Sequence, residues 1–283
     1  MTTKDANGRD FRKGRSVALA LLTSVVFAPI SFAESPAVAP RAAIPGGTFE
    51  SVLPPAPGVK AVTVAPFELD RTPVTNGQFA QFVRENPKWR RDRVARLFAD
   101  ERYLQHWRTP TEPDDTVERQ PVTHVSWFAA TAYCEARGAR LPRWYEWEFA
   151  AAASETRADA RKDDAWRQQI LDWYSKSARG RLPDVGQTPP NFYGVRDLHG
   201  VVWEWVEDVG AMMVSGDNRE QGDPDVKRFC GTGALSMEQK ENYALLMRVA
   251  MLSSMQARYT SNTMGFRCAV DGAARKTSRV SAE

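Results

Sequence analysis

The stretch Asp197-Leu198-His199-Gly200-Val201-Val202-Trp203-Glu204-Trp205 combines two acids, a glycine and two tryptophans within nine residues. Calcium prefers about six to eight hard oxygen ligands, which carboxylates and backbone carbonyls supply. Asp197 and Glu204 can provide the carboxylates, and in an extended segment the carbonyls of Gly200 and Val202 face the same edge. The stretch therefore predicts one calcium ion bound by these four residues. The alternative is that the two acids lie at a turn and at the edge of the core, held only by hydrogen bonds.

The segments around this stretch predict short strands and helices in mixed order. Apolar residues predict strands at residues 62–64 and 67–69, and helical spacing with capping residues predicts helices at 76–86, 126–137, 143–153 and 164–176. Residues 89–119 lack clean periodicity and predict an irregular, partly helical insertion. After Pro189-Pro190 the apolar runs are short and broken by glycine. The pattern favours an α+β domain in which loops dominate.

The N-terminus has the composition of an export signal. Five basic residues precede an apolar run from Val17 to Phe27, and Ser31-Phe32-Ala33 follows. Because this run is shorter than the roughly 20 residues that span a bilayer, we expect cleavage after Ala33 rather than anchorage. We therefore expect a periplasmic protein. The general secretion route is favoured, and export in the folded state stays open.

The charge of the mature chain limits its partners. Removal of residues 1–33 takes away five of the 38 Lys and Arg and two of the 35 Asp and Glu, which leaves 33 of each. A chain without net charge has no general electrostatic attraction to nucleic acid or to an anionic membrane. We therefore expect no nucleic-acid partner. We also expect a monomer without a membrane anchor, acting on a small-molecule or peptide-derived substrate.

The layout predicts one domain. No Gly/Ser-rich linker or repeat divides residues 45–271, whereas residues 34–44 predict an extended lead-in and residues 272–283 a polar tail. Three cysteines in an oxidising compartment allow one disulfide with one thiol left over. Their spacing alone does not decide which two are paired.

Four blocks of sequence, in order, resemble the formylglycine-generating-enzyme (sulfatase-modifying-factor) family. The blocks are residues 44–49 with 67–76, residues 121–142 with Glu146-Trp147-Glu148, residues 191–205, and Gly265-Phe266-Arg267-Cys268-Ala269. Together they extend over almost the whole mature chain. The resemblance implies that family's α+β fold, which is related to C-type lectins and contains little regular secondary structure.

The resemblance also implies two structural features. Family members bind calcium at the positions that match Asp197, Gly200, Val202 and Glu204; the family's other calcium site draws on an Asn-rich segment that this chain lacks. Some members join the positions of Cys134 and Cys268 by a disulfide, which would tie an early helix to the last strand. The alternative is a pair of buried free thiols.

The chain departs from the family at the copper-binding site. Active formylglycine-generating enzymes bind copper through two nearby cysteines that follow an Arg-Gly-Gly-Ser stretch. The corresponding stretch here is Cys230-Gly231-Thr232-Gly233-Ala234, and the position that matches the second cysteine is Ala244. Because thiolates are the ligands that select Cu(I), we expect neither copper nor copper-dependent formylglycine generation.

The sequence identifies catalytic residues only weakly. Cys230 is a solitary thiol and His124 precedes a strand-to-helix turn, so both are candidates, although Cys230 fits a small buried residue at least as well. We expect His199 to be structural. Trp89 and Trp107 could stack on an aromatic or sugar-like ligand, but a core position is the default for both.

These features favour the periplasmic pyoverdine-maturation branch of the family. The resemblance then implies oxidation of the chromophore of a siderophore precursor, and the chain would be an oxidoreductase-type maturation enzyme. The alternative is a non-catalytic binding or accessory protein for a periplasmic metalloenzyme or another partner.

Overall fold

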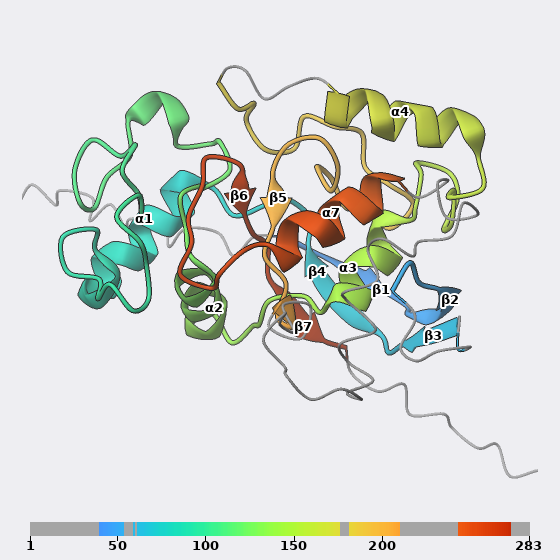
Figure 1. Cartoon of the computed structure of the whole chain (residues 1–283), viewed down its shortest axis with the longest axis horizontal. Helices are drawn as coiled ribbons and strands as arrows, with labels where there is room; N and C mark the ends of the chain where they lie inside the picture. The colour runs from blue at the N-terminus through green and yellow to red at the C-terminus, as the bar shows by residue number, and fades with distance from the viewer. Residues whose placement is uncertain (1–39, 54–58, 60, 176–180, 210–242, 273–283) are drawn as a thin grey trace, which may run out of the picture. The chain divides into compact units, whose positions relative to one another are not determined.

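The computed structural model describes residues 40–53, 59, 61–175, 181–209 and 243–272, all within the unit formed by residues 36–283 (Figure 1). Four short strands are followed by most of the described helices, and three further short strands lie near the C-terminal end, which confirms the α+β class. The elements are β1 (Arg41–Ile44), β2 (Gly47–Glu50), β3 (Ala61–Val64), β4 (Phe67–Asp70), α1 (Asn76–Glu85), η1 (Pro87–Trp89), η2 (Asp115–Val117), α2 (Trp127–Ala136), α3 (Trp144–Ala151), α4 (Asp164–Ser175), β5 (Trp203–Glu204), α7 (Tyr243–Ser253), β6 (Met264–Gly265) and β7 (Ala269–Asp271).

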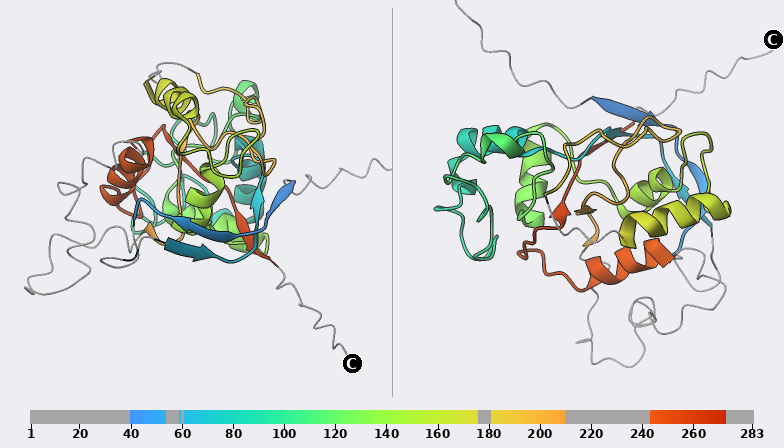
Figure 2. Two further views of the ribbon diagram at one scale, coloured as in Figure 1. Left: turned by 90° about the vertical axis from the view of Figure 1, so that its right-hand side faces the viewer. Right: turned by 90° about the horizontal axis from the view of Figure 1, so that it is seen from above.

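Three small sheets bring distant parts of the chain together. In the largest, β4 lies between β1 and β7 and is antiparallel to both (Figure 2). Leu69 is opposite Ala42 on one side and Ala269 on the other. β2 pairs with β3, and β5 pairs in parallel with β6. The strands predicted at residues 62–64 and 67–69 are therefore both present, but they belong to different sheets.

Side-chain caps set the starts of two helices where the sequence predicts them. The Thr75 hydroxyl accepts a hydrogen bond from the backbone N–H of Gln78, whose side chain accepts one from Thr75 N–H in return, which forms a capping box. Ser126 Oγ accepts a hydrogen bond from Ala129 N–H and starts α2. Both caps satisfy N–H groups that have no partner inside the helix.

An aromatic cluster packs α1 against α2 and the segment that leads into β7. Phe79 lies 5.7 Å from Tyr133 and 5.9 Å from Phe266 between ring centroids. Trp107 joins the same cluster, because its ring lies 6.1 Å from Phe79 and its Nε1 donates to Asn76 Oδ1 at 2.9 Å. Trp107 is thus a core residue, as its default interpretation expects.

In two parts of the chain the observed helices differ from those that the local sequence pattern predicts. The insertion at residues 89–119 contains turns and the short helix η2, with no α-helix, so its partly helical character is limited to 3-10 turns. By contrast, α7 is an 11-residue helix in a region where the sequence predicts only short apolar runs. None of the described helices is long and apolar enough to cross a membrane.

A disulfide joins Cys134 of α2 to Cys268, the residue before β7. Both cysteines are fully buried and their Cα atoms are 5.6 Å apart. This confirms the expected pairing. Cys230 lies outside the described residues.

Replacing Cys134 and Cys268 together by alanine should lower the free energy of unfolding by roughly 4 to 5 kcal/mol, because the bridge restricts a long loop in the unfolded chain. Urea unfolding of the mature protein measures this change. Alkylation without reduction, followed by peptide mass spectrometry, should label Cys230 alone. A label on Cys134 would contradict the pairing.

Glu148 of α3 anchors the segment that follows β2. Its carboxylate is fully buried and accepts hydrogen bonds from Ser51 Oγ at 2.5 Å and Val52 N–H at 2.8 Å, while Arg161 lies 3.8 Å away. Burial raises the pKa of Glu148 from its ordinary 4.5 to about 7, although the donors and Arg161 act in the opposite direction. The folded protein therefore binds this proton more tightly than the unfolded chain does.

The contribution of Glu148 to stability should decrease as the pH rises. It is fully present below about pH 4.5 and is lost as the pH increases through the folded pKa of about 7. Relative to Glu148→Gln, which does not titrate, the wild type should lose roughly 3 kcal/mol of unfolding free energy between pH 4.5 and 8. Urea unfolding of both proteins at several pH values measures the difference. A difference that does not change with pH would contradict the assignment.

Candidate functional site

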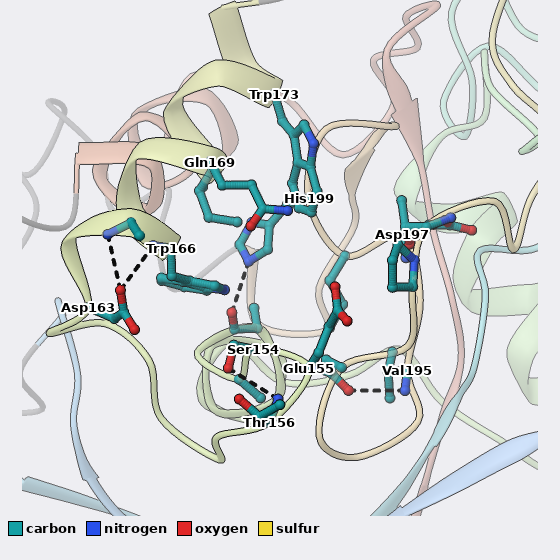
Figure 3. A pocket seen from close by; sticks show the side chains of 18 residues that line it. Ser154, Glu155, Thr156, Asp163, Trp166, Gln169, Trp173, Val195, Asp197 and His199 are labelled. Carbon is teal, nitrogen blue, oxygen red and sulfur yellow. Dashed lines mark hydrogen bonds between the residues drawn. The ribbon is translucent and has the colours of Figure 1, made fainter.

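A cavity of about 350 Å³ opens between α4, the segment after α3 and the loop that ends at His199 (Figure 3). Its walls include Trp166, Trp173 and His199, and its polar groups include Glu155 and Gln169. Pockets that hold small ligands are commonly of this size and combine aromatic walls with a few polar groups. We therefore take this cavity as the candidate functional site.

One face of α4 forms a wall of the cavity. Trp166, Gln169, Ile170 and Trp173 follow helical spacing, so they lie on the same side of the helix. Asp163 fixes the start of the helix, because its Oδ1 accepts hydrogen bonds from the N–H groups of Ala165 and Trp166. This face of the predicted helix thus lines a cavity rather than packing only into the core.

His199 lies between the indoles of the cavity (Figure 3). Its ring meets Trp166 edge to face at 5.8 Å and stacks near Trp173 at 6.5 Å. Burial lowers the pKa of His199 from 6.5 to about 4, and the nearby cations Arg248 and Arg267 add to the effect. The imidazole is therefore neutral at neutral pH. Its Nε2 carries the proton, because it lies 2.9 Å from the carbonyl of Ala151, which can only accept.

Asp197 organises the loop beside the cavity. One carboxylate oxygen accepts from Gly186 N–H, and the other accepts from the N–H of Thr188 at 3.2 Å and from its hydroxyl at 2.8 Å. Asp197 itself has a positive φ of 60°, a conformation that acids tolerate better than most residues. The carboxylate thus closes a turn between residues 186 and 197.

Gly200 permits the close approach of α4. Its φ is 81°, and a Cβ at this position would lie 2.8 Å from Cβ of Trp173. The chain bends here and becomes a strand only at Trp203. The extended geometry that would align the carbonyls of Gly200 and Val202 is therefore not present at Gly200.

Glu204 is fully buried and forms an ion pair with Arg267, which is also fully buried. Arg267 Nη2 donates to Glu204 Oε1 at 2.8 Å, its Nε donates at 3.0 Å to Oε2, and Trp147 Nε1 donates to Oε2 at 2.8 Å. The guanidinium of Arg248 lies over the ring of Trp147, 3.6 Å from its centroid, and also donates to the backbone carbonyl of Glu204. The ion pair and the aromatic groups behind His199 thus form one packed unit.

The two predicted calcium carboxylates have separate partners in this arrangement. Every carboxylate oxygen of Asp197 and Glu204 accepts at least one protein hydrogen bond. Among the described residues, no three or more His, Cys, Asp or Glu side chains group so that they could hold a metal. In this structure Asp197 closes a turn and Glu204 pairs with Arg267. The four predicted residues therefore fit these two roles better than the binding of one shared calcium ion. Calcium binding stays a prediction for experiment.

The remaining candidates lie elsewhere. His124 does not line the cavity; its ring lies 4.9 Å from that of His106, and burial lowers its pKa. Cys230 is outside the described residues. The sequence singles out Trp89 and Trp107 as possible ligand-stacking residues, whereas this cavity uses Trp166 and Trp173. The sequence did contain a signal for the buried ion pair, namely Arg267, because an arginine inside an apolar run requires a buried acid as its partner.

Comparisons with known proteins cover most of the chain. A family model described as the sulfatase-modifying factor enzyme 1-like domain matches residues 30–272. The chain is 29% identical over 271 residues to inactive C-alpha-formylglycine-generating enzyme 2 of Bos taurus, with 80% of this chain and 86% of that protein covered. It is 30% identical to formylglycine-generating enzyme of Streptomyces coelicolor, with 86% and 95% covered. The solved structure of PvdO from Pseudomonas aeruginosa matches with a TM-score of 0.44 and 18% identity over 82% of this chain and 94% of that one.

Glu204→Gln should lower the free energy of unfolding by roughly 3 to 5 kcal/mol, because Arg267 would be left buried without an anion. Glu207→Gln is a matched control, since Glu207 is partly exposed and pairs with Arg143 near the surface at 3.2 Å; it should cost about 1 kcal/mol or less. Urea unfolding measures both changes. Equal effects of the two substitutions would contradict a structural role for the buried pair.

The calcium prediction is tested on the wild type and on Asp197→Asn. A calcium site at these residues requires that calcium added to the metal-stripped wild type raises its melting temperature and that the rise disappears in Asp197→Asn. A wild type whose melting temperature does not respond to calcium would refute the site.

Proposed function

Because the chain belongs to the family of the sulfatase-modifying factor enzyme 1-like domain, we propose that it takes part in the oxidative maturation of an exported substrate. The substrate is the chromophore of a siderophore precursor of the pyoverdine type, and the protein acts in the periplasm after cleavage behind Ala33. The observation that carries this proposal is the cavity with two indole walls and a neutral imidazole.

The cavity supports a planar aromatic substrate. Trp166 and Trp173 lie on either side of His199 (Figure 3), and indoles favour stacked or edge-on contacts with other rings. A volume of about 350 Å³ accommodates a small fused-ring system. Glu155 and Gln169 are exposed residues of the lining and can bond to heteroatoms of such a ring.

The cysteines argue against the family's copper chemistry in this chain. The sequence contains three cysteines, and Cys134 and Cys268 are joined to each other. Cys230 is the single thiol left, so one chain does not have the two thiolates that a copper site of this kind requires. The proposed oxidation therefore differs in mechanism from formylglycine generation.

A non-catalytic binding role is the second candidate. The position of His199 favours it, because the Nε2 proton is engaged by the carbonyl of Ala151 and the ring is buried. In this role the cavity would hold an aromatic ligand for a periplasmic metalloenzyme or another partner.

Deleting the gene in a producing strain should leave an unoxidised precursor with altered fluorescence in the culture, and the wild-type gene should restore the mature siderophore. Trp173→Ala should fail to restore it, because a wall of the cavity is lost. Phe192→Ala is the matched control, since Phe192 is an exposed aromatic outside the cavity lining. Immunoblots should confirm equal amounts of both variants.

Purified protein supplied with copper and oxygen should also leave a Cys-containing sulfatase peptide unconverted. A deletion strain that still matures its siderophore, or a source genome without a siderophore pathway, would eliminate the proposed substrate and favour the binding role. Conversion of the peptide would contradict the argument from the cysteines.

A further inference from the structure

A second cavity, of about 370 Å³, lies in a different part of the fold. It is lined by η1, the turns that follow it and one face of α2, and it shares no residue with the first cavity. The proposed function does not use it. Its lining is more apolar than that of the first cavity and consists largely of aromatic rings and short aliphatic side chains.

Aromatic rings in edge-on contact form one wall of this second cavity. Phe98 lies 6.0 Å from Trp89 and 5.4 Å from Phe128 between ring centroids, and Phe128 lies 5.4 Å from Trp127. Phe98 is 40% exposed, which is unusual for a large apolar side chain in a cluster of this kind. The wall thus presents ring surface that a planar molecule can cover.

Two lining residues each carry a buried polar atom that has no hydrogen-bond partner in the part of the chain that the structure describes. The atoms are Nε1 of Trp89, whose side chain is only 7% exposed, and Oγ1 of Thr131. Trp107, Trp127 and Trp147 differ from Trp89, since the Nε1 of each donates to a protein oxygen. A buried N–H without a partner costs free energy, which a ligand acceptor would recover.

The charges at the second cavity favour an anion. Lys88 and Arg93 line it, with Glu135 as the single acid of the lining, and Lys88 Nζ lies 5.8 Å from the ring of Trp89. Two cations against one acid attract a carboxylate, and a carboxylate offers the acceptor oxygens that Trp89 and Thr131 require.

We propose that this second cavity binds a small planar aromatic carboxylate. The ring of the ligand packs against Phe98 and Phe128, and its carboxylate accepts hydrogen bonds from Trp89 Nε1 and Thr131 Oγ1 beside Lys88. The proposal goes beyond the proposed function, because it concerns different residues and holds whether or not the first cavity takes a siderophore precursor.

Isothermal titration calorimetry of the mature protein with 1-naphthoate tests this site. Binding should saturate, while cyclohexanecarboxylate, which has the charge without the flat ring, should bind markedly more weakly. Trp89→Phe keeps the ring and removes the N–H, and it should weaken binding about tenfold, the size expected for one hydrogen bond to a charged acceptor. Thr131→Val, which keeps the shape of the side chain, should also weaken the binding of 1-naphthoate.

Three controls separate a ligand contact from a structural role. Glu135→Gln should bind at least as tightly as the wild type, because it removes the one acid of the lining. Trp166→Phe, in the first cavity, should leave the affinity unchanged. In a ¹⁵N spectrum, the indole N–H signal that is missing from Trp89→Phe should shift when 1-naphthoate is added to the wild type.

The proposal is overturned by any of three results. The first is the absence of saturable binding, and the second is wild-type affinity in both Trp89→Phe and Thr131→Val. The third is a loss of affinity in Trp166→Phe alone, which would place the ligand in the first cavity.

Discussion

The buried ion pair between Arg267 and Glu204 is the interaction around which the loop-rich core is arranged. Neither side chain is exposed, and charges removed from water are tolerated only when opposite charge and hydrogen bonds surround them. Arg267 also donates to the carbonyls of Asp70 and Arg196, and Glu204 accepts from Trp147. Segments from β4, the loop before His199, α3 and β5 are therefore fixed around one pair of charges. Moving any of them would leave a buried polar group without a partner.

The ion pair also determines the inner wall of the first cavity. Trp147 donates to Glu204, stacks under the guanidinium of Arg248 and meets the ring of His199 at 5.8 Å. His199, whose pKa burial lowers to about 4, contacts this packing on one side and the carbonyl of Ala151 through its Nε2. Little regular secondary structure surrounds His199. The polar and aromatic packing holds the segments together there, as a large sheet does in other folds, and the disulfide between α2 and the entry to β7 adds to it. A ligand would meet a preformed surface there.

Features that depend on neighbouring residues follow from the sequence, and features that depend on distant contacts do not. The starts of α1 and α2 are predictable, because Thr75 and Ser126 cap N–H groups within the first turn of their own helices. The apolar face of α4 is also predictable from the sequence, because Trp166, Ile170 and Trp173 recur at helical spacing within one short segment. By contrast, Gly200 is required by the approach of Trp173, which no local pattern indicates.

The sequence by itself determined the family, through blocks that match in order. It also contains three cysteines, so that a single free thiol remains once Cys134 and Cys268 are paired. Only the tertiary structure decided that Glu204 faces a buried arginine, and that Trp89 lines a cavity while Trp107 is core. The physical reason is the range of the interactions. Motifs, caps and composition are properties of short segments, whereas the partner of a buried charge or indole depends on which remote segments meet it after folding.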